Sequence, residues 1–172
     1  MAAELILTDG LYETLCDHLL PPGATCEEAA FGFARTSSDG NRLVFELLEL
    51  YPVPPEGFVE HSRFFLHLND ETRARVIKRA HDLIASLIEF HSHPLQLTAG
   101  FSPSDIAGFD EFVPHVKWRL KQRPYAAFVF TPSTFDALAW PGDVAEPLTF
   151  DSIADGGRRY APTNMTFRNW RQ

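Results

Sequence analysis

The sequence predicts an α+β fold, a single domain in which helices flank a central mixed or antiparallel β-sheet. Segments rich in β-branched and aromatic residues alternate with segments whose apolar residues recur at helical spacing. The 172 residues are the size of one ordinary domain, and no repeat or low-complexity linker divides them. Apolar residues make up 45% of the chain, with 15 Phe among them, which is enough for a sizeable core.

The first half of the chain is expected to begin with a helix. Apolar residues at helical spacing predict this helix over 9–20, and the Pro21-Pro22-Gly23 triplet ends it. Segments 27–35 and 42–51 read as two strands joined by a polar hairpin loop, and 61–68 as a third strand.

The second half alternates helices and strands. An apolar stripe predicts a helix from residue 69 or 70 to about 86, followed by a buried strand over 87–92. A long helix is expected over 102–122, and segments 125–131 and 135–140 read as a β-hairpin. The core of the domain then spans about 9–140, and 141–172 is expected to be an irregular C-terminal tail.

Charge and cysteine content exclude several classes of protein. The 23 acidic residues against 15 basic ones give a net charge of −8, which disfavours nucleic acids and anionic membranes as partners. Cys16 and Cys26 are too few for a disulfide framework or a thiolate zinc site. The N-terminus carries early acids and no basic segment, so no signal peptide is predicted, and the expected location is the cytoplasm.

Two histidines and an aspartate have the spacing of metal ligands. His91 and His93 are two residues apart on a predicted strand, so their side chains project to the same face. Pro94 ends the strand, and Asp105 lies one turn into the helix that begins at Ser102. A strand end facing a helix N-terminus can bring two imidazoles and one carboxylate together. Such a set leaves a fourth tetrahedral position for water, as in catalytic zinc sites, where the water is a hydrolytic nucleophile.

Each part of this motif also has a purely structural interpretation. A histidine on a strand is commonly a core or surface residue. Ser102-Pro103-Ser104-Asp105 is a good capping box, with Ser at the N-cap, Pro at the first helical position and Asp three residues after the cap. The two interpretations are compatible, because capping would fix the turn that carries the carboxylate. From spacing alone, metal binding is a hypothesis.

The motif as a whole resembles the signature of the JAMM (MPN-plus) zinc-dependent isopeptidases, H-[ST]-H-P followed by S-x-x-D. The matching residues here are HSHP at 91–94 and, after seven residues, SPSD at 102–105. The family also has a glutamate on an early strand, which Glu27 supplies within EEAAFGFA, with Glu28 as the second choice. The resemblance covers about residues 9–140. It implies a compact prokaryotic-type JAB/MPN-like domain whose zinc site lies between a strand end and a helix N-terminus.

The resemblance also implies a role for each residue. His91, His93 and Asp105 would be the ligands of one Zn²⁺ ion, with water as the fourth. Glu27 would be the general base that activates the water and then protonates the departing amine. Ser102 would donate a hydrogen bond to the developing oxyanion. The expected activity is that of a metalloprotease or isopeptidase that hydrolyses an amide bond after the C-terminus of a ubiquitin-like or sulfur-carrier-like protein.

Partners and alternatives follow from the same resemblance. Besides the ubiquitin-like substrate, activating (E1-like) and conjugating (E2-like) proteins are expected partners, and the substrate tail would lie beside 61–68 or the loop 95–101. One alternative is a zinc hydrolase of small peptides or amides. Another is a non-catalytic MPN-like scaffold, which would not require the intact Glu, His and Asp set.

Overall fold

The computed structural model describes residues 1–142 and 144–170 of the chain. The strands are β1 (Ala2–Leu7), β2 (Ala29–Ser38), β3 (Arg42–Pro52), β4 (Phe58–His61), β5 (Leu66–Leu68), β6 (Ser86–Ser92), β7 (Tyr125–Phe130), β8 (Phe135–Trp140), β9 (Leu148–Asp155) and β10 (Arg158–Tyr160). The helices are α1 (Leu11–Leu19), α2 (Asp70–Asp82), α3 (Pro103–Arg119) and α4 (Met165–Asn169), with a short 3-10 helix at Pro55–Gly57.

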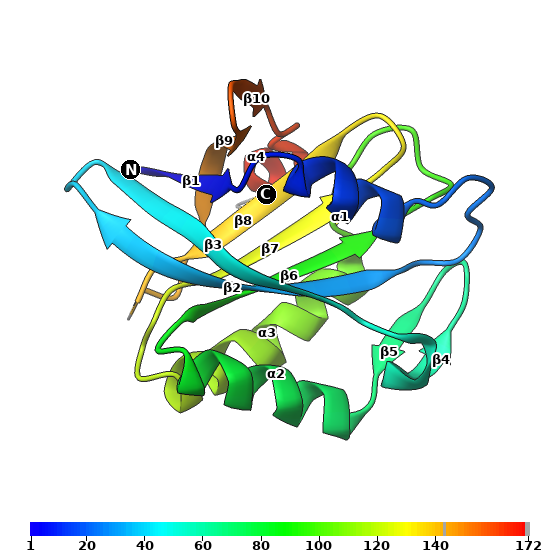
Figure 1. Cartoon of the computed structure of the whole chain (residues 1–172), viewed down its shortest axis with the longest axis horizontal. Helices are drawn as coiled ribbons and strands as arrows, with labels where there is room; N and C mark the ends of the chain where they lie inside the picture. Colours follow the sequence, from blue (N-terminus) through cyan, green and yellow to red (C-terminus); the bar gives the residue numbers. More distant parts are fainter. Residues whose placement is uncertain (143, 171–172) are drawn as a thin grey trace.

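Seven strands close into a barrel. They pair in the order β1-β3-β2-β6-β7-β8-β9, and β9 returns to pair with β1 (Figure 1). β1 runs parallel to both of its neighbours and β6 runs parallel to β7, whereas the other pairs of the barrel are antiparallel. β10 adds one further strand to β9, and β4 and β5 form a separate two-stranded sheet.

The predicted fold class is therefore wrong: the chain is not a JAB/MPN-like domain with a central sheet flanked by helices. The sheet is closed, and α2 and α3 cover one side of it (Figure 1). Closure depends on β1 and β9, which come from opposite ends of the chain and pair through Leu5 and Ile153. A local sequence pattern contains no information about a partner strand that distant, so neither strand was predicted.

Most of the individual elements predicted within 9–140 are present, with one difference inside this range and one after it. Segment 61–68 is not one strand, because residues 62–65 form the turn between β4 and β5, where the hydroxyl of Ser62 accepts hydrogen bonds from the backbone of Phe64 and Phe65. Segment 141–172, expected to be irregular, contains β9, β10 and α4.

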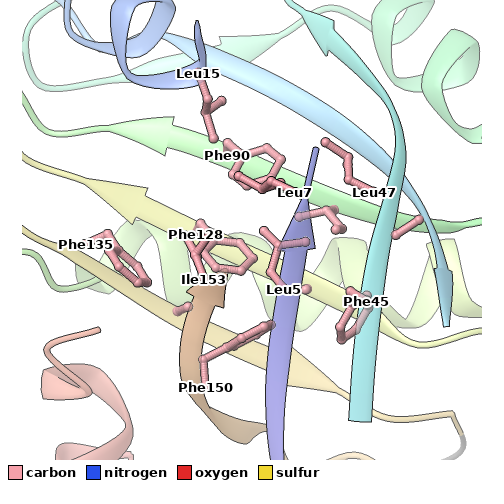
Figure 2. Close-up of a cluster of buried hydrophobic side chains, with 14 of the residues drawn as sticks. Leu5, Leu7, Leu15, Phe45, Leu47, Phe90, Phe128, Phe135, Phe150 and Ile153 are labelled. Carbon is pink, nitrogen blue, oxygen red and sulfur yellow. The ribbon is translucent and has the colours of Figure 1, made fainter. Parts of the chain in front are cut away.

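The barrel interior is filled by aromatic and aliphatic side chains. Phe90 and Phe128 stack at 5.2 Å between ring centroids, and Phe128 also contacts Phe150 at 4.7 Å (Figure 2). Leu5 and Phe45 are fully buried in the same cluster. Burying such rings stabilises the closed sheet, since each removes a large apolar area from water.

A second apolar cluster holds α2 and α3 against the outer face of the barrel. Val76 of α2 and Phe109 of α3 pack with Phe31, Leu87 and Tyr125 of the strands. Because side chains alternate along a strand, the residues of β6 that do not enter the barrel face this helical layer. The end of β6 and the start of α3 therefore meet outside the barrel.

Among the described residues, no helix is long and apolar enough to cross a membrane.

Candidate metal centre

His91 and His93 project from the end of β6 toward the helical layer. Ile88 and Phe90 belong to the interior cluster, so Glu89 and His91 lie on the opposite, outer face of the strand. His93 follows two residues after His91, and its backbone N–H donates to the carbonyl of Phe130 at 2.8 Å, which continues the pairing with β7. Both imidazoles are buried, with 5% and 4% of their residue surface exposed.

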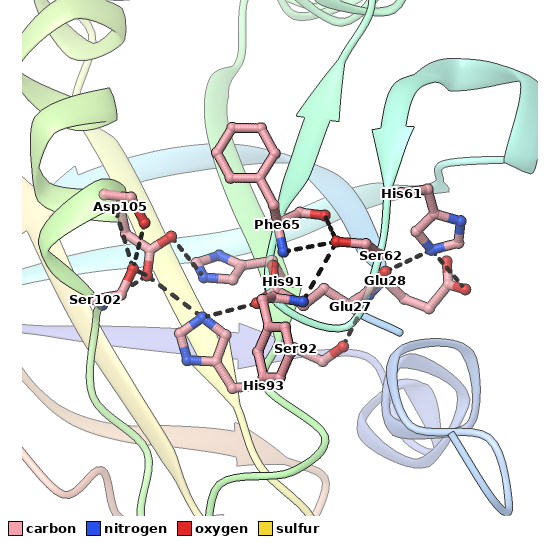
Figure 3. Close-up of polar contacts among 12 residues, drawn as sticks. Glu27, Glu28, His61, Ser62, Phe65, His91, Ser92, His93, Ser102 and Asp105 are labelled. Atoms are coloured by element: carbon pink, nitrogen blue, oxygen red, sulfur yellow. Dashed lines mark hydrogen bonds and ion pairs between the residues drawn. The ribbon is translucent and has the colours of Figure 1, made fainter. Parts of the chain in front are cut away.

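Asp105 is fixed in the first turn of α3 by the capping box. The hydroxyl of Ser102 accepts a hydrogen bond from the backbone N–H of Asp105 at 3.2 Å, and Asp105 Oδ2 accepts one from the backbone N–H of Ser102 at 2.7 Å. The structural interpretation of this motif is therefore confirmed. It leaves Asp105 Oδ1 directed at His91, so capping and ligation are compatible (Figure 3).

His91, His93 and Asp105 form a group that could hold a metal ion. Their donor atoms all lie within 4.8 Å of one another. His91 Nε2 is 3.5 Å from Asp105 Oδ1, and His93 Nε2 is 3.4 Å from Asp105 Oδ2. Tetrahedral bonds of about 2.0–2.2 Å place ligand atoms roughly 3.3–3.6 Å apart. Each imidazole has this separation from one oxygen of Asp105, His91 from Oδ1 and His93 from Oδ2. His91 Nε2 is also buried without a hydrogen-bond partner, as expected of a nitrogen that ligates an ion.

His91 and Asp105 strongly affect each other's pKa. Burial alone would lower the pKa of His91, but the charge of Asp105, aided by Glu89, raises it to about 9. Burial alone would likewise raise the pKa of Asp105, yet the charge of His91 and the hydrogen bond from the backbone N–H of Ser102 hold it far below its usual value. Without a metal, the group is thus stabilised by an internal ion pair.

Glu27, and not Glu28, faces this group. β2 pairs with β6 from Ala29 opposite His91, and the same register continued by two residues puts Glu27 opposite His93. Its Oε1 lies 3.6 Å from His93 Nε2 (Figure 3). Burial raises the pKa of the Glu27 carboxyl, and the two histidines oppose this rise.

Glu28 points to the other face of the strand, where its Oε1 is 3.2 Å from His61 Nε2. His61 was assigned no role from the sequence, but it helps to hold the backbone of Glu27. Its Nε2 is 2.6 Å from the carbonyl of Glu27, and the Glu27 N–H donates to the carbonyl of Ser62 at 3.0 Å. The start of β2 is therefore attached to the β4–β5 sheet.

Glu89 and Tyr125 were missed by the sequence analysis. Glu89 Oε1 lies 3.7 Å from His91 Nδ1, and the hydroxyl of Tyr125 donates to Glu89 Oε2 at 2.6 Å. A carboxylate behind a metal-binding imidazole orients the ring and sets its tautomer. Burial raises the pKa of Glu89. The missed signal was the two-residue spacing, since Glu89, His91 and His93 alternate on one face of the strand.

The serines near the group have defined contacts. Ser102 Oγ donates to Asp105 Oδ2 at 2.8 Å and also lies 2.9 Å from Ser104 Oγ. Ser92 is fully buried, and its hydroxyl accepts from the backbone N–H of Glu28 at 2.9 Å. Ser92 thus couples β6 to the start of β2 on the face away from the histidines.

A cavity of about 240 Å³ opens beside the group. The carboxylates of Glu27, Glu89 and Asp105 line it together with His91 and Ser102. Aromatic residues of α3 and residues of the β4–β5 sheet form its other walls. Two of the three candidate ligands, His91 and Asp105, therefore border a space that a small molecule or a substrate segment can enter.

No model of a known protein family matches the chain, and no curated protein matches it. The resemblance to the JAMM isopeptidases consequently rests on the residues of the motif alone.

Proposed function

We propose that the chain is a metal-dependent hydrolase of amide bonds, with Zn²⁺ held by His91, His93 and Asp105. The observation that carries the proposal is Glu27, a buried carboxylate on the neighbouring strand that is aimed at this set of donors. Three nitrogen and oxygen ligands without cysteine are typical of a catalytic zinc site with an open position. When bound, such an ion supplies Lewis acidity, polarising a carbonyl and lowering the pKa of a water molecule.

The residues of the chain supply the proton transfers. Glu27 accepts a proton from the attacking water and donates it to the departing amine, which its raised pKa favours. Ser102 borders the cavity, and its hydroxyl would donate to the developing oxyanion. The hydroxyl of Ser102 has one proton, which it donates in a hydrogen bond to Asp105 Oδ2. The proposed role therefore requires the hydroxyl to rotate away from Asp105.

The proposed substrate is the C-terminal tail of a ubiquitin-like or sulfur-carrier-like protein, joined through an amide to an amine. An extended tail can add to a free strand edge through backbone hydrogen bonds. Residues 64–68, in the turn and second strand of the β4–β5 sheet, line the cavity, and Phe64 and Phe65 are exposed there. The support for this substrate class is the motif and the site; the barrel fold adds none.

Metal content and turnover test the proposal together. Purified wild type should contain about one zinc per chain, His91→Ala should contain almost none, and His115→Ala, at an exposed histidine of α3, should match wild type. Unchanged zinc content in His91→Ala would remove the proposed centre.

The base is tested with the two adjacent glutamates. Glu27→Gln should keep its zinc but cleave a peptide ending in Gly-Gly-(amide)-lysine roughly 10²- to 10⁴-fold more slowly. Glu28→Gln, whose side chain faces the other way, is the matched control and should cleave at a rate near that of wild type. Absence of zinc from the wild type, together with dimerisation through a helical face, would instead favour the non-catalytic scaffold.

A further inference from the structure

Arg73 lies on the wall of the cavity, opposite in charge to the three carboxylates that also line it. It belongs to α2, whose other cations are paired: Arg75 with Glu71 and Arg79 with Glu49, at 3.0 and 2.6 Å. Within the described part of the chain, no salt bridge joins Arg73 to a carboxylate. Its guanidinium stacks instead over an aromatic ring, with Cζ 5.7 Å from the centroid of Phe112.

Glu89 is the cavity carboxylate whose pKa the charge of Arg73 lowers, against the larger rise from burial, but its oxygens have other partners. Oε2 accepts the hydrogen bond of Tyr125 at 2.6 Å, and Oε1 lies beside His91. The guanidinium of Arg73 therefore keeps donors for a ligand. A planar guanidinium with free donors matches a carboxylate with two parallel hydrogen bonds.

Apolar side chains make up a large part of the cavity wall. They include Phe109 and Phe112 of α3 and Leu66 and Leu68 of β5, which line the cavity together with Arg73 and the carboxylates. The volume of about 240 Å³ is below the roughly 300–1,000 Å³ of sites for drug-sized ligands. This space suits one amino-acid residue with an apolar side chain better than a long segment.

We propose that this cavity binds the leaving residue of the substrate through its free α-carboxylate. The carboxylate pairs with Arg73, and the apolar side chain packs against Phe109 and Phe112. An acidic side chain would offer the same charge, but the apolar walls favour a residue whose only carboxylate is the terminal one. The assignment rests on the proposed function only in placing the scissile amide beside Glu27 and the metal ligands.

The reaction then releases a single free amino acid. Water adds to the acyl carbon, the C–N bond breaks, the acyl product leaves as a carboxylate, and the amine leaves protonated by Glu27. No oxidant, reductant or second substrate is required. In terms of the proposed substrate, the amine joined to the tail would be the α-amine of a single apolar residue with a free carboxylate, and the chain would remove that residue.

Binding is measured first, by titration calorimetry with three probes of defined charge. N-acetyl-phenylalanine should bind, whereas N-acetyl-phenylalaninamide, which lacks the carboxylate, should bind roughly 10- to 100-fold more weakly. The α-amide of N-acetyl-aspartic acid, which has a side-chain carboxylate only, should bind as weakly as N-acetyl-phenylalaninamide. Equal affinity for N-acetyl-phenylalanine and its amide would overturn the inference. Tight binding of the aspartic acid α-amide would overturn the α-carboxylate assignment.

Variants on α2 identify the recognising cation. Arg73→Gln should lose roughly 10- to 100-fold in affinity for N-acetyl-phenylalanine, and Arg73→Lys should lose less because it keeps the charge. Arg75→Gln, which disrupts an exposed pair on the same helix, should bind like wild type. Unchanged affinity in Arg73→Gln with an unchanged melting temperature would refute the role of Arg73.

Repeating the titration after chelation separates this inference from the proposed function. Binding that persists without metal and still depends on Arg73 supports the pocket even if no hydrolysis is found. If binding disappears with the metal and is unchanged in Arg73→Gln, the carboxylate of the probe coordinates the ion. This result overturns the inference and leaves the hydrolase proposal standing.

Discussion

Metal binding at His91 is expected to release one proton near neutral pH. In the metal-free protein the charge of Asp105 raises the pKa of His91 to about 9, so at pH 7 the ring is cationic. It must lose that proton before Nε2 can ligate an ion. From pH 7 to the pKa is 9 − 7 = 2 units, so the apparent zinc affinity at pH 7 should be roughly 100-fold below its high-pH limit. Affinity should rise about tenfold for each pH unit between pH 7 and 8.5.

The assay is calorimetric titration of zinc into chelator-stripped protein in two buffers of different ionisation enthalpy. The difference between the two observed enthalpies counts the protons released at each pH. Zinc affinity that is constant between pH 7 and 8.5, with no proton released, would refute the reasoning. His91→Ala serves as the control, because it should lose both the binding and the proton release.

The remaining predictions concern pH, packing and positioning. Because the folded pKa of His91 is raised, protonated His91 stabilises the metal-free protein fully below about pH 6.5, and this stabilisation is lost as pH rises through 9. The 2.5-unit shift corresponds to roughly 3 kcal/mol of unfolding free energy, measured by urea unfolding at each pH. An unfolding free energy that does not change over this pH range would contradict the prediction. Gly32→Ala should cost about 1–3 kcal/mol in the same assay, since a Cβ there would meet Leu47 at 2.7 Å; an unchanged midpoint would show that Leu47 moves aside freely. Asp155→Ala should cost about 1–2 kcal/mol, because Asp155 caps α1 through two backbone N–H groups at 2.9 and 2.8 Å. His61→Ala should retain zinc and lower kcat several-fold with KM little changed, because it removes a contact to the backbone that carries the proposed base, Glu27. A loss of zinc as large as the loss of kcat would assign His61 a purely structural role.

The candidate site could be predicted from sequence because its parts are local. His91 and His93 share a face because side chains alternate along a strand, and the capping box of α3 is formed by four consecutive residues. The choice of Glu27 over Glu28 came from the resemblance to the family motif, and in the structure Glu27 faces the histidines whereas Glu28 does not.

The partners of these residues were not predictable in the same way. Glu89 lies behind His91, Tyr125 holds Glu89, and Arg73 reaches the cavity from a helix that precedes β6. Each of these contacts joins residues whose neighbourhood depends on the packing of α2, α3 and the strands. From the sequence of an amphipathic helix, a charged residue that faces solvent cannot be distinguished from one that faces a cavity.

By itself, the sequence determined the strand and helix that carry His91, His93 and Asp105, because hydrogen bonding and side-chain alternation over a few residues define them. Only the tertiary structure decided that the sheet is a closed barrel. Closure requires β1 to lie between β3 and β9, and the pairing of β1 with β9 joins the two ends of the chain. Backbone hydrogen bonds between strands are nearly independent of side-chain identity, so partner choice follows from how the whole set of apolar faces is buried.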